Sequence, residues 1–298
     1  MPPGPERDED IASWTRSLGL GGLVDLHLHF LPDRMMTKVW AYFDQVEERV
    51  GAVWPVWYRQ PEAERLAVLE SFGVLRFAPL AYPHKPGMAE WLNGWMREFA
   101  ERVPAAVPTA TFYPEPSARS YVESALSAGV RCFKSHVQVG AYDPRDPLLT
   151  PVWGALAEAG VPVVVHAGHG PERGPHTGLD VFAEVLRRHP RLVAVLAHAG
   201  MPEYEAALEL VDRFPRVYLD TTMVGVPFTE QLMPSPADWV DRLAGIGDRI
   251  VLGSDFPNIP YPYSTQLRAI AGWAADDRLG VAFLRAVLHD TPAKLLNL

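Results

Sequence analysis

The sequence predicts an α/β protein, and more narrowly a TIM-type (β/α)8 barrel. Eight short apolar segments are separated, nearly everywhere, by segments with a helical pattern, which is typical of a parallel sheet buried on both faces. The count of eight favours closure of this sheet into a barrel. An open doubly wound sheet is the main alternative, but no Gly-x-Gly-x-x-Gly motif follows any predicted strand, so a dinucleotide-binding fold has no support.

The elements alternate along the chain after a long first connection. The predicted strands cover residues 24–30, 74–81, 107–113, 130–134, 161–166, 192–198, 217–220 and 249–255. The predicted helices cover residues 88–102, 118–128, 152–159, 179–189, 203–214, 237–244, 265–275 and 279–288. Gly129 and Gly160 stand directly after two of these helices, where glycine commonly ends a helix.

The domain organisation follows from this pattern. Residues 1–22 are expected to be a disordered tail and a short lead-in, and residues 23–298 a single barrel domain. The stretch at about 31–73 is rich in aromatic residues and too long for a plain connection, so we interpret it as an insertion with helices of its own.

Composition excludes several classes of function. The net charge of −9 disfavours binding to nucleic acid or to an anionic membrane, and no run of about 18 apolar residues predicts a membrane span. The acidic, proline-rich start is unlike a signal peptide, so a cytoplasmic location is expected. Cys132 is the only cysteine, which rules out an internal disulfide and a cysteine zinc site. We therefore expect a small-molecule partner, and any metal must be held by His, Asp or Glu.

The first predicted strand places chemistry on one face. Side chains alternate along a strand, so Asp25, His27 and His29 share one face and the apolar residues between them take the other. Two imidazoles at this spacing can coordinate one metal ion at the end of the strand. For a single His-x-His the alternative is two hydrogen-bonded structural histidines, and only further ligands downstream can decide.

Such residues recur at later strand ends. Lys134, His166 and His198 lie 32 residues apart, the length of one βα unit, and each follows an apolar run; Asp255 ends the last strand in the same way. In a barrel all these ends open on one mouth, where the active sites of this fold lie. Neutral imidazoles and a carboxylate suit Zn²⁺, and a zinc-bound water, with its pKa near 7, is a nucleophile at neutral pH. Asp255 is placed to take its proton, His198 to hydrogen-bond it or to polarise the substrate, and Asp25 is expected to orient a ligand histidine.

The pattern resembles the amidohydrolase superfamily, and within it the branch of metal-dependent hydrolases that includes aminocarboxymuconate semialdehyde decarboxylase. The resemblance covers residues 23–298 and rests on Asp25-x-His27-x-His29, Lys134-x-His136, His166, His198 and Gly253-Ser254-Asp255. It implies that one zinc is bound by His27, His29, His166 and Asp255, that Asp255 is the base, and that His198 contacts the metal-bound water.

Lys134 has two interpretations under this resemblance. In binuclear members a carboxylated lysine at the end of strand four bridges two metals, so a second metal is expected only if Lys134 carries that modification. As a plain ammonium it pairs instead with a substrate carboxylate, which we favour. His136 is expected to be a wall residue rather than a ligand. No organic cofactor is expected, and the resemblance implies a homodimer, for which the tryptophan-rich insertion offers an apolar interface.

Loop residues near these motifs are candidates for substrate contact. They are His169, Arg173, Asn258, Tyr261 and Tyr263, with Arg34 and Arg59 in the insertion as further carboxylate binders. For each, an ordinary loop role is the alternative. The sequence as a whole predicts a zinc-dependent hydrolase of a small carboxylated substrate. A non-oxidative decarboxylase (a lyase) of a small aromatic or unsaturated acid is the first alternative, and a non-catalytic barrel that binds a metabolite is the second.

Overall fold

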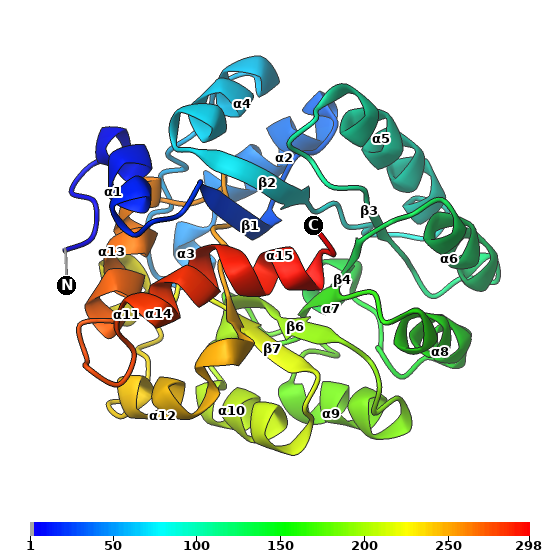
Figure 1. Cartoon of the computed structure of the whole chain (residues 1–298). Coiled ribbons are helices and arrows are strands. Elements are labelled where there is room, and N and C mark those ends of the chain that lie inside the picture. Colours follow the sequence, from blue (N-terminus) through cyan, green and yellow to red (C-terminus); the bar gives the residue numbers. More distant parts are fainter. Residues whose placement is uncertain (1–2) are drawn as a thin grey trace. The chain divides into compact units, whose positions relative to one another are not determined.

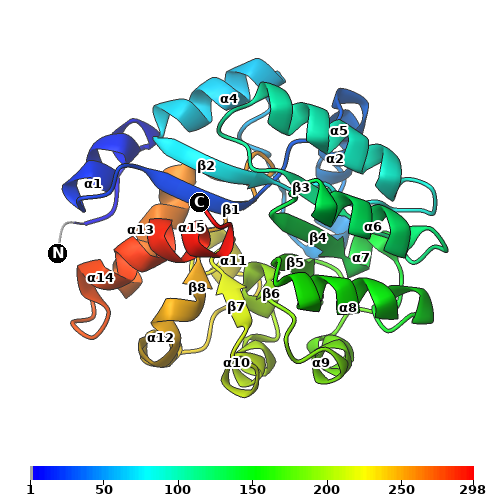
Figure 2. The ribbon, with the colours of Figure 1, turned by 45° about the vertical axis from the view of Figure 1, so that its right-hand side comes forward.

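The computed structural model describes residues 3–298, which divide into two compact units. Unit 1 contains the described residues up to Phe77 together with Thr221–Lys294, and unit 2 contains Ala78–Asp220 with Leu295–Leu298. Figures 1 and 2 label the elements of both units. The single domain predicted for residues 23–298 stays a prediction.

Unit 1 contains the first two strands and the last one. Strand β1 (Leu23–Leu28) pairs with β2 (Val74–Pro79), and β8 covers Ile250–Val251. All six residues of β1 are buried, including Asp25 and His27, because this strand lies within the core of the unit. Its backbone is tied to the segment after β8, since the Leu26 N–H donates to the carbonyl of Leu252 at 2.9 Å.

The helices of unit 1 come from both ends of the chain. They are α1 (Ile11–Ser17), α2 (Asp33–Phe43), α3 (Glu47–Val50), α4 (Glu62–Ser71), α11 (Pro227–Glu230), α12 (Trp239–Ile246), α13 (Tyr263–Trp273), α14 (Gly280–Arg285) and α15 (Thr291–Leu295), with 3₁₀ turns at Asp8–Asp10 and Gly247–Arg249 and a π turn at Ala286–Asp290. The aromatic stretch after β1 therefore has three helices of its own. Asp8 contacts Tyr58 and Ser264, so the disorder predicted for the N-terminal tail is wrong for this part of it.

Unit 2 is a parallel sheet with alternating helices. Its strands are β3 (Thr109–Thr111), β4 (Cys132–His136), β5 (Val163–His166), β6 (Ala194–Leu196) and β7 (Val217–Asp220), in that order. Its helices are α5 (Ala89–Arg102), α6 (Ala118–Ser127), α7 (Val137–Gly140), α8 (Thr150–Ala159), α9 (Leu179–Arg188) and α10 (Tyr204–Arg213), with 3₁₀ turns at Pro147–Leu149 and Ala197–Gly200. Helices α6, α8, α9 and α10 cover one face of the sheet (Figures 1 and 2).

Every predicted strand and helix has a counterpart, but three boundaries differ in ways that matter. Strand β4 runs on to His136, so the prediction that Lys134 ends its strand is wrong. Strand β6 ends at Leu196, and His198 lies in the turn that follows. Residues 291–295, which follow the last predicted helix, form α15. The register of β4 and β5 then pairs His136 with His166 and Lys134 with Val164.

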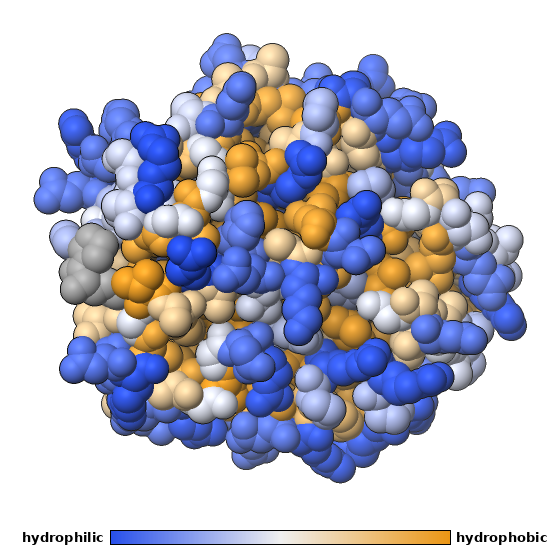
Figure 3. Space-filling view, in the orientation of Figure 1, coloured by the Kyte–Doolittle hydropathy of each residue, from blue (hydrophilic) through white to orange (hydrophobic). Residues whose placement is uncertain are grey.

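The surface is polar over most of the face drawn in Figure 3, with apolar residues in scattered patches. Large exposed apolar side chains such as Leu75 and Trp91 occur singly, which is normal for a globular protein. Within residues 3–298, no helix combines the length and the apolar character that a membrane span requires.

Candidate metal centre

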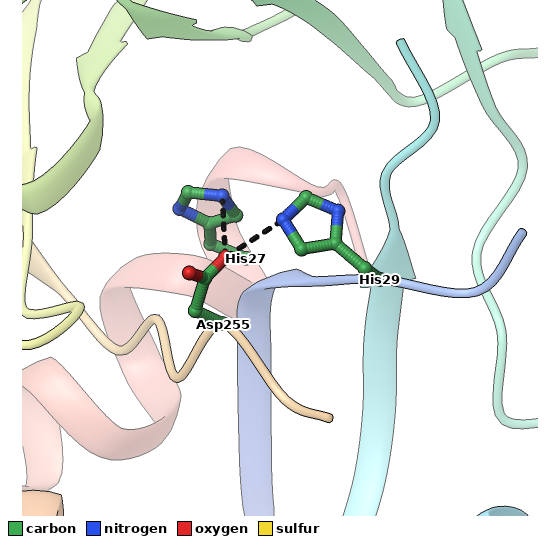
Figure 4. A group of neighbouring side chains, drawn as sticks. All are labelled: His27, His29 and Asp255. Atoms are coloured by element: carbon green, nitrogen blue, oxygen red, sulfur yellow. Dashed lines mark ion pairs between the residues drawn. The ribbon is translucent and has the colours of Figure 1, made fainter. Parts of the chain in front are cut away.

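Two histidines and one aspartate meet in unit 1. His27 and His29 come from β1 and the residue just beyond it, and Asp255 from the loop after β8. The Oδ1 atom of Asp255 lies 2.7 Å from Nε2 of His29 and 3.6 Å from Nε2 of His27, and the two ring centroids are 5.2 Å apart. Figure 4 shows the carboxylate directed toward both rings. Among residues 3–298, this is the group of His, Cys, Asp or Glu side chains that comes together closely enough to share one ion, with its ligand atoms all within 4.8 Å.

The backbone around this group is fixed by hydrogen bonds between β1 and the segment after β8. The carbonyl of His27 accepts from the N–H groups of Ser254 at 3.0 Å and Asp255 at 2.8 Å, and the His29 N–H donates to Phe256 at 2.7 Å. Asp255 has a φ of +64°, a left-handed conformation that costs a non-glycine residue roughly 1–3 kcal/mol. These hydrogen bonds hold it there, and the carboxylate faces the imidazoles as a result.

Asp25 lies beneath the centre and is fully buried. Its Oδ2 atom accepts from the hydroxyls of Ser254 at 2.5 Å and Tyr263 at 2.8 Å, and its Oδ1 atom accepts from the backbone N–H of His27 at 3.1 Å. These contacts fix the backbone that carries His27, and the expected role of Asp25 in orienting a ligand histidine stays a prediction.

A hydroxyl orients the ring of His27. Thr222 Oγ1 lies 3.2 Å from Nδ1 of His27. If Nδ1 carries the proton and donates to this oxygen, Nε2 is the nitrogen that presents a lone pair, and Nε2 is the atom that faces Asp255. A partner on the second ring nitrogen is what a metal-ligating histidine requires.

These donors fit a divalent metal ion. Two imidazole nitrogens and a carboxylate oxygen suit Zn²⁺ and other first-row divalent ions, and three protein ligands are enough for a catalytic site that keeps an open position. His27 and His29 are almost fully buried, and the side chain of Asp255 is 13% exposed. The structure thus brings together three of the four predicted ligands, and the fourth, His166, belongs to unit 2.

Unit 2 contains a second group of histidines at the ends of its strands. The rings of His136 and His166 are stacked, with centroids 4.2 Å apart and planes 11° apart, and His198 meets His166 edge to face at 4.9 Å. Nε2 of His166 lies 2.7 Å from the carbonyl of Gly170, which makes Nε2 the protonated nitrogen and Nδ1 the acceptor. His136 therefore packs its ring against that of His166, and its role as a loop or wall residue stays a prediction.

His198 and Lys134 lie within the same unit. His198 has a φ of +55° and Ala199 a φ of +48°, and the N–H of His198 donates to Oδ1 of Asp220 at 2.8 Å. Two left-handed non-glycine residues in a row are costly, and such strain is concentrated at functional sites. Lys134 is fully buried in β4. The side chain of Lys134 therefore lies in the protein interior, which holds for both of its predicted roles.

The predicted substrate residues of unit 2 differ in their surroundings. His169 is braced on both ring nitrogens, by Thr177 Oγ1 at 2.8 Å from Nδ1 and by Glu203 Oε1 at 3.3 Å from Nε2. Glu203 also accepts from the backbone N–H of His169 at 2.9 Å. These contacts favour a loop-fixing role for His169. Arg173 is exposed.

The predicted substrate residues of unit 1 are largely buried. Asn258 accepts from the indole of Trp40 at 3.2 Å through Oδ1 and from that of Trp54 at 2.8 Å through its carbonyl, so it anchors the insertion to the loop that carries Asp255. Burial raises the pKa of Tyr261 well above its ordinary value, and the nearby charge of Asp255 raises this pKa further. Tyr261 is therefore a protonated phenol close to Asp255.

The arginines of the insertion divide into paired and unpaired ones. Arg59, a predicted carboxylate binder, is already paired with Asp44, and Arg34 is exposed. Arg65 was not predicted. It is 1% exposed, its Nε and Nη1 atoms have no hydrogen-bond partner, and its guanidinium carbon lies 4.9 Å from the ring centroid of Phe30. The signal for its burial is its place four residues before the buried Leu69, on the same face of α4.

The comparisons with known proteins identify a family and a fold. A family model described as amidohydrolase matches residues 24–298, and no curated protein matches the chain. An uncharacterised TIM-barrel protein from Bordetella bronchiseptica has a TM-score of 0.68 at 19% identity, over 93% of this chain and 98% of that one.

Two further solved structures are similar over nearly the whole chain. A 5-carboxyvanillate decarboxylase from Novosphingobium aromaticivorans, complexed with manganese and 4-hydroxy-3-methoxy-5-nitrobenzoic acid, has a TM-score of 0.61 at 14% identity, over 93% of this chain and 96% of that one. A candidate 2-pyrone-4,6-dicarboxylic acid hydrolase from Pseudomonas putida has a TM-score of 0.60 at 14% identity, over 93% and 98%. These likenesses confirm the predicted TIM-type (β/α)8 fold.

Proposed function

We propose that this chain, which belongs to the amidohydrolase family by the match over residues 24–298, is a zinc-dependent hydrolase of a small carboxylated substrate. The observation that carries this proposal is the meeting of His27, His29 and Asp255, whose ligand atoms lie within 4.8 Å of one another. A buried pair of imidazoles against a carboxylate is a set of metal ligands, and amidohydrolase chemistry depends on such a centre.

The proposed metal is a single divalent ion. When bound, it supplies Lewis acidity and lowers the pKa of a coordinated water toward 7. Zinc is the proposal because the centre is rich in imidazole, but the same donors accept manganese, which is the ion in the structurally similar decarboxylase. His166 stays the fourth ligand that the resemblance implies. Its Nε2 contact with the carbonyl of Gly170 supports this role, because it leaves Nδ1 as the donor nitrogen. A second ion requires carboxylation of Lys134.

The proposed roles of the side chains follow from their atoms. Asp255 holds and moves the proton of the reaction at its carboxylate, which is the least buried of the three ligands and so the one that a substrate reaches. His198 is the proposed hydrogen-bonding partner of the nucleophilic water. Lys134 is the proposed partner of a substrate carboxylate, as the sequence predicts.

The burial of Arg65 is a second observation, separate from the metal centre, that supports a carboxylated substrate. A buried guanidinium with two donor nitrogens unpaired costs several kcal/mol, and a carboxylate that accepts from both nitrogens removes this cost. Phe30, which packs against Arg65, directly follows the ligand His29, and Trp40, at 5.6 Å, donates to Asn258 in the loop of Asp255. We therefore place a carboxylate of the substrate at Arg65.

A non-oxidative decarboxylase is the second candidate function. The similarity to 5-carboxyvanillate decarboxylase favours it, and the same residues serve it, with Asp255 and His198 handling the proton that replaces carbon dioxide. Arg65 fits both functions, since each needs a bound carboxylate. The small-molecule partner, the homodimer and the cytoplasmic location stay predictions from the sequence.

One assay separates the two functions. The purified protein, loaded with Zn²⁺ or Mn²⁺, is given lactones, amides and aromatic carboxylic acids while hydrolysis and carbon dioxide release are followed in parallel. We expect hydrolysis of a carboxylated lactone or amide without gas, and its loss in Asp255→Asn. Gas without hydrolysis rejects the hydrolase in favour of the decarboxylase. Turnover of neither class by fully metal-loaded protein favours a barrel that only binds a metabolite.

A further inference from the structure

The N-terminal segment, residues 3–10, ends in a buried hydrogen-bond network. Asp8 accepts from the hydroxyl of Tyr58 through Oδ2, and from the backbone N–H of Ser264 at 2.9 Å through Oδ1. The hydroxyl of Tyr58 in turn accepts from the backbone N–H of Tyr263 at 2.7 Å. One carboxylate thus fixes a tyrosine of the aromatic insertion and the first turn of α13 together.

The network continues to the metal centre. Tyr263, fully buried at the start of α13, donates from its hydroxyl to Oδ2 of Asp25 at 2.8 Å. Asp25 accepts from the backbone N–H of His27 and from the hydroxyl of Ser254, and the Ser254 oxygen accepts from the N–H of Phe256 at 3.1 Å. The two strand ends that carry His27 and Asp255 are therefore fixed to the same carboxylate.

Both phenols act as donors throughout the ordinary pH range. Burial raises the pKa of Tyr58, and the charge of Asp8 raises it further. Burial also raises the pKa of Tyr263 well above its ordinary value, with Asp25 adding to the shift. Neither hydroxyl ionises near neutral pH, so each keeps its proton for the carboxylate it faces. Hydrogen bonds to an ionised carboxylate are short and strong; the one from Tyr263 to Asp25 is buried, and the one from Tyr58 to Asp8 is partly buried.

The segment itself is tied to α13. Nη1 of Arg268 donates to the carbonyl of Pro5 at 3.1 Å and also to that of Glu6. A side chain on Gly4 would put its Cβ 2.7 Å from the Cα of Arg268, so the segment packs closely against the helix. Asp8 is therefore held at a fixed place relative to Tyr58 and Ser264.

We propose that Asp8, Tyr58 and Tyr263 are positioning residues of the metal centre, and that the N-terminal segment sets the geometry of His27 and Asp255 through Asp25. This inference rests on the proposed function, because it assumes that the centre binds a metal. Asp25 accepts directly from the backbone N–H of His27, and Tyr263 donates to Asp25. Loss of contacts that support a metal ligand typically weakens metal binding about 10- to 100-fold.

The test is metal affinity and metal geometry in the full chain. Zn²⁺ affinity is measured by competition with a chromophoric chelator, and the visible spectrum of the Co²⁺-loaded protein reports the ligand geometry. We expect Tyr263→Phe to weaken Zn²⁺ binding about 10- to 100-fold and to shift the Co²⁺ bands. Tyr58→Phe and Asp8→Asn act from further away, so we expect the same changes with smaller amplitude, about 3- to 10-fold.

Two controls separate positioning from general destabilisation. Glu9→Gln changes an exposed neighbour of Asp8, and Tyr121→Phe removes a buried phenol of unit 2 that donates to Glu115 at 3.0 Å. Both are expected to keep the wild-type affinity and spectrum, even where Tyr121→Phe lowers the melting temperature. Wild-type affinity and spectrum in all three network variants overturn the proposal. Failure of the wild type itself to bind metal overturns the proposed function, and the inference with it.

Discussion

The two histidine groups of this protein are built differently. In unit 1, His27 and His29 face the carboxylate of Asp255, with Nε2 atoms 3.6 and 2.7 Å from one of its oxygens. In unit 2, His136, His166 and His198 face one another, ring against ring, at centroid distances of 4.2 and 4.9 Å. The first arrangement directs donor atoms to a common point, and the second packs one pair of rings face to face and the other pair edge to face.

The two groups differ in whether a carboxylate brings imidazole nitrogens to one point. Stacked rings such as those of His136 and His166 carry their nitrogens in the ring planes, so stacking by itself brings no two donor atoms to one point. A carboxylate that meets the nitrogens supplies negative charge and a common focus, and its own backbone must then be held in place. Asp255 is held in a left-handed conformation by hydrogen bonds to the strand that carries the histidines. In unit 2, the ring of His166 contacts the carbonyl of Gly170, and the backbone N–H of His198 donates to the carboxylate of Asp220.

Alanine substitutions in the two groups give the largest expected contrast. We expect His27→Ala to lose nearly all bound zinc, because it removes a donor that no other side chain of the centre replaces. His136→Ala is expected to keep the zinc content of the wild type, since its ring is a wall against His166. Metal content after purification without chelators measures both.

His166→Ala tests the link between the two groups. As the fourth predicted ligand, its loss is expected to weaken zinc binding while leaving the centre of unit 1 intact. Full zinc content and affinity in His166→Ala would restrict the metal ligands to unit 1. Loss of zinc in His136→Ala would show that the stacked group is itself part of the metal centre.

A substitution of Arg65 tests whether unit 1 also binds a carboxylate of the substrate. We expect Arg65→Met to raise KM for a carboxylated substrate about 10- to 100-fold, the loss of charge-assisted hydrogen bonds worth about 1.5–3 kcal/mol. The stability of the protein without substrate is expected to change little, because Nε and Nη1 of Arg65 have no hydrogen-bond partner to lose and an apolar side chain still packs against Phe30 and Trp40.

The matched control is Arg49→Met, which removes another arginine of the insertion that lies over an aromatic ring, that of Tyr42 at 4.5 Å. Steady-state kinetics and thermal unfolding of both variants provide the test. An unchanged KM in Arg65→Met, or a large loss of stability without substrate, would assign Arg65 to packing alone.

The smallest effect concerns an ion-pair network of unit 2 formed by Asp143, Arg145 and Glu184. Hydrogen bonds from Arg145 lower the pKa of Asp143, and Arg145 also pairs with Glu184 at 2.9 Å. A lowered folded-state pKa stabilises the protein above the ordinary value of 3.8, and this contribution is lost as pH falls through the lowered pKa. Because the groups are partly exposed, we expect Asp143→Asn to cost only about 0–1 kcal/mol at pH 7 and nothing at low pH. Urea unfolding at both pH values measures this, and a cost that persists in acid would contradict it.

The sequence predicted the centre where local pattern and topology agree. The alternation of Asp25, His27 and His29 predicts their common face. The apolar run before Asp255 predicts its place near the last strand, although β8 ends at Val251 and Asp255 lies in the loop that follows rather than at the strand end. The resemblance to the amidohydrolases then named the ligands, and the family match confirms that membership.

Other features depend on contacts that spacing does not encode. Lys134 follows an apolar run, but β4 continues to His136 because its register with β5 extends that far. The pairing of Arg59 with Asp44, and the burial of Arg65 between Phe30 and Trp40, arise from the packing of the insertion. The role of Asn258 as an anchor for two tryptophans likewise needs residues some 200 positions away.

The most direct measurement is anomalous diffraction at the zinc edge from crystals of the zinc-loaded protein. We expect one strong peak about 2.0–2.2 Å from Nε2 of His27, Nε2 of His29 and a carboxylate oxygen of Asp255. A zinc peak bound elsewhere, or none at these three side chains in fully loaded crystals, would contradict it.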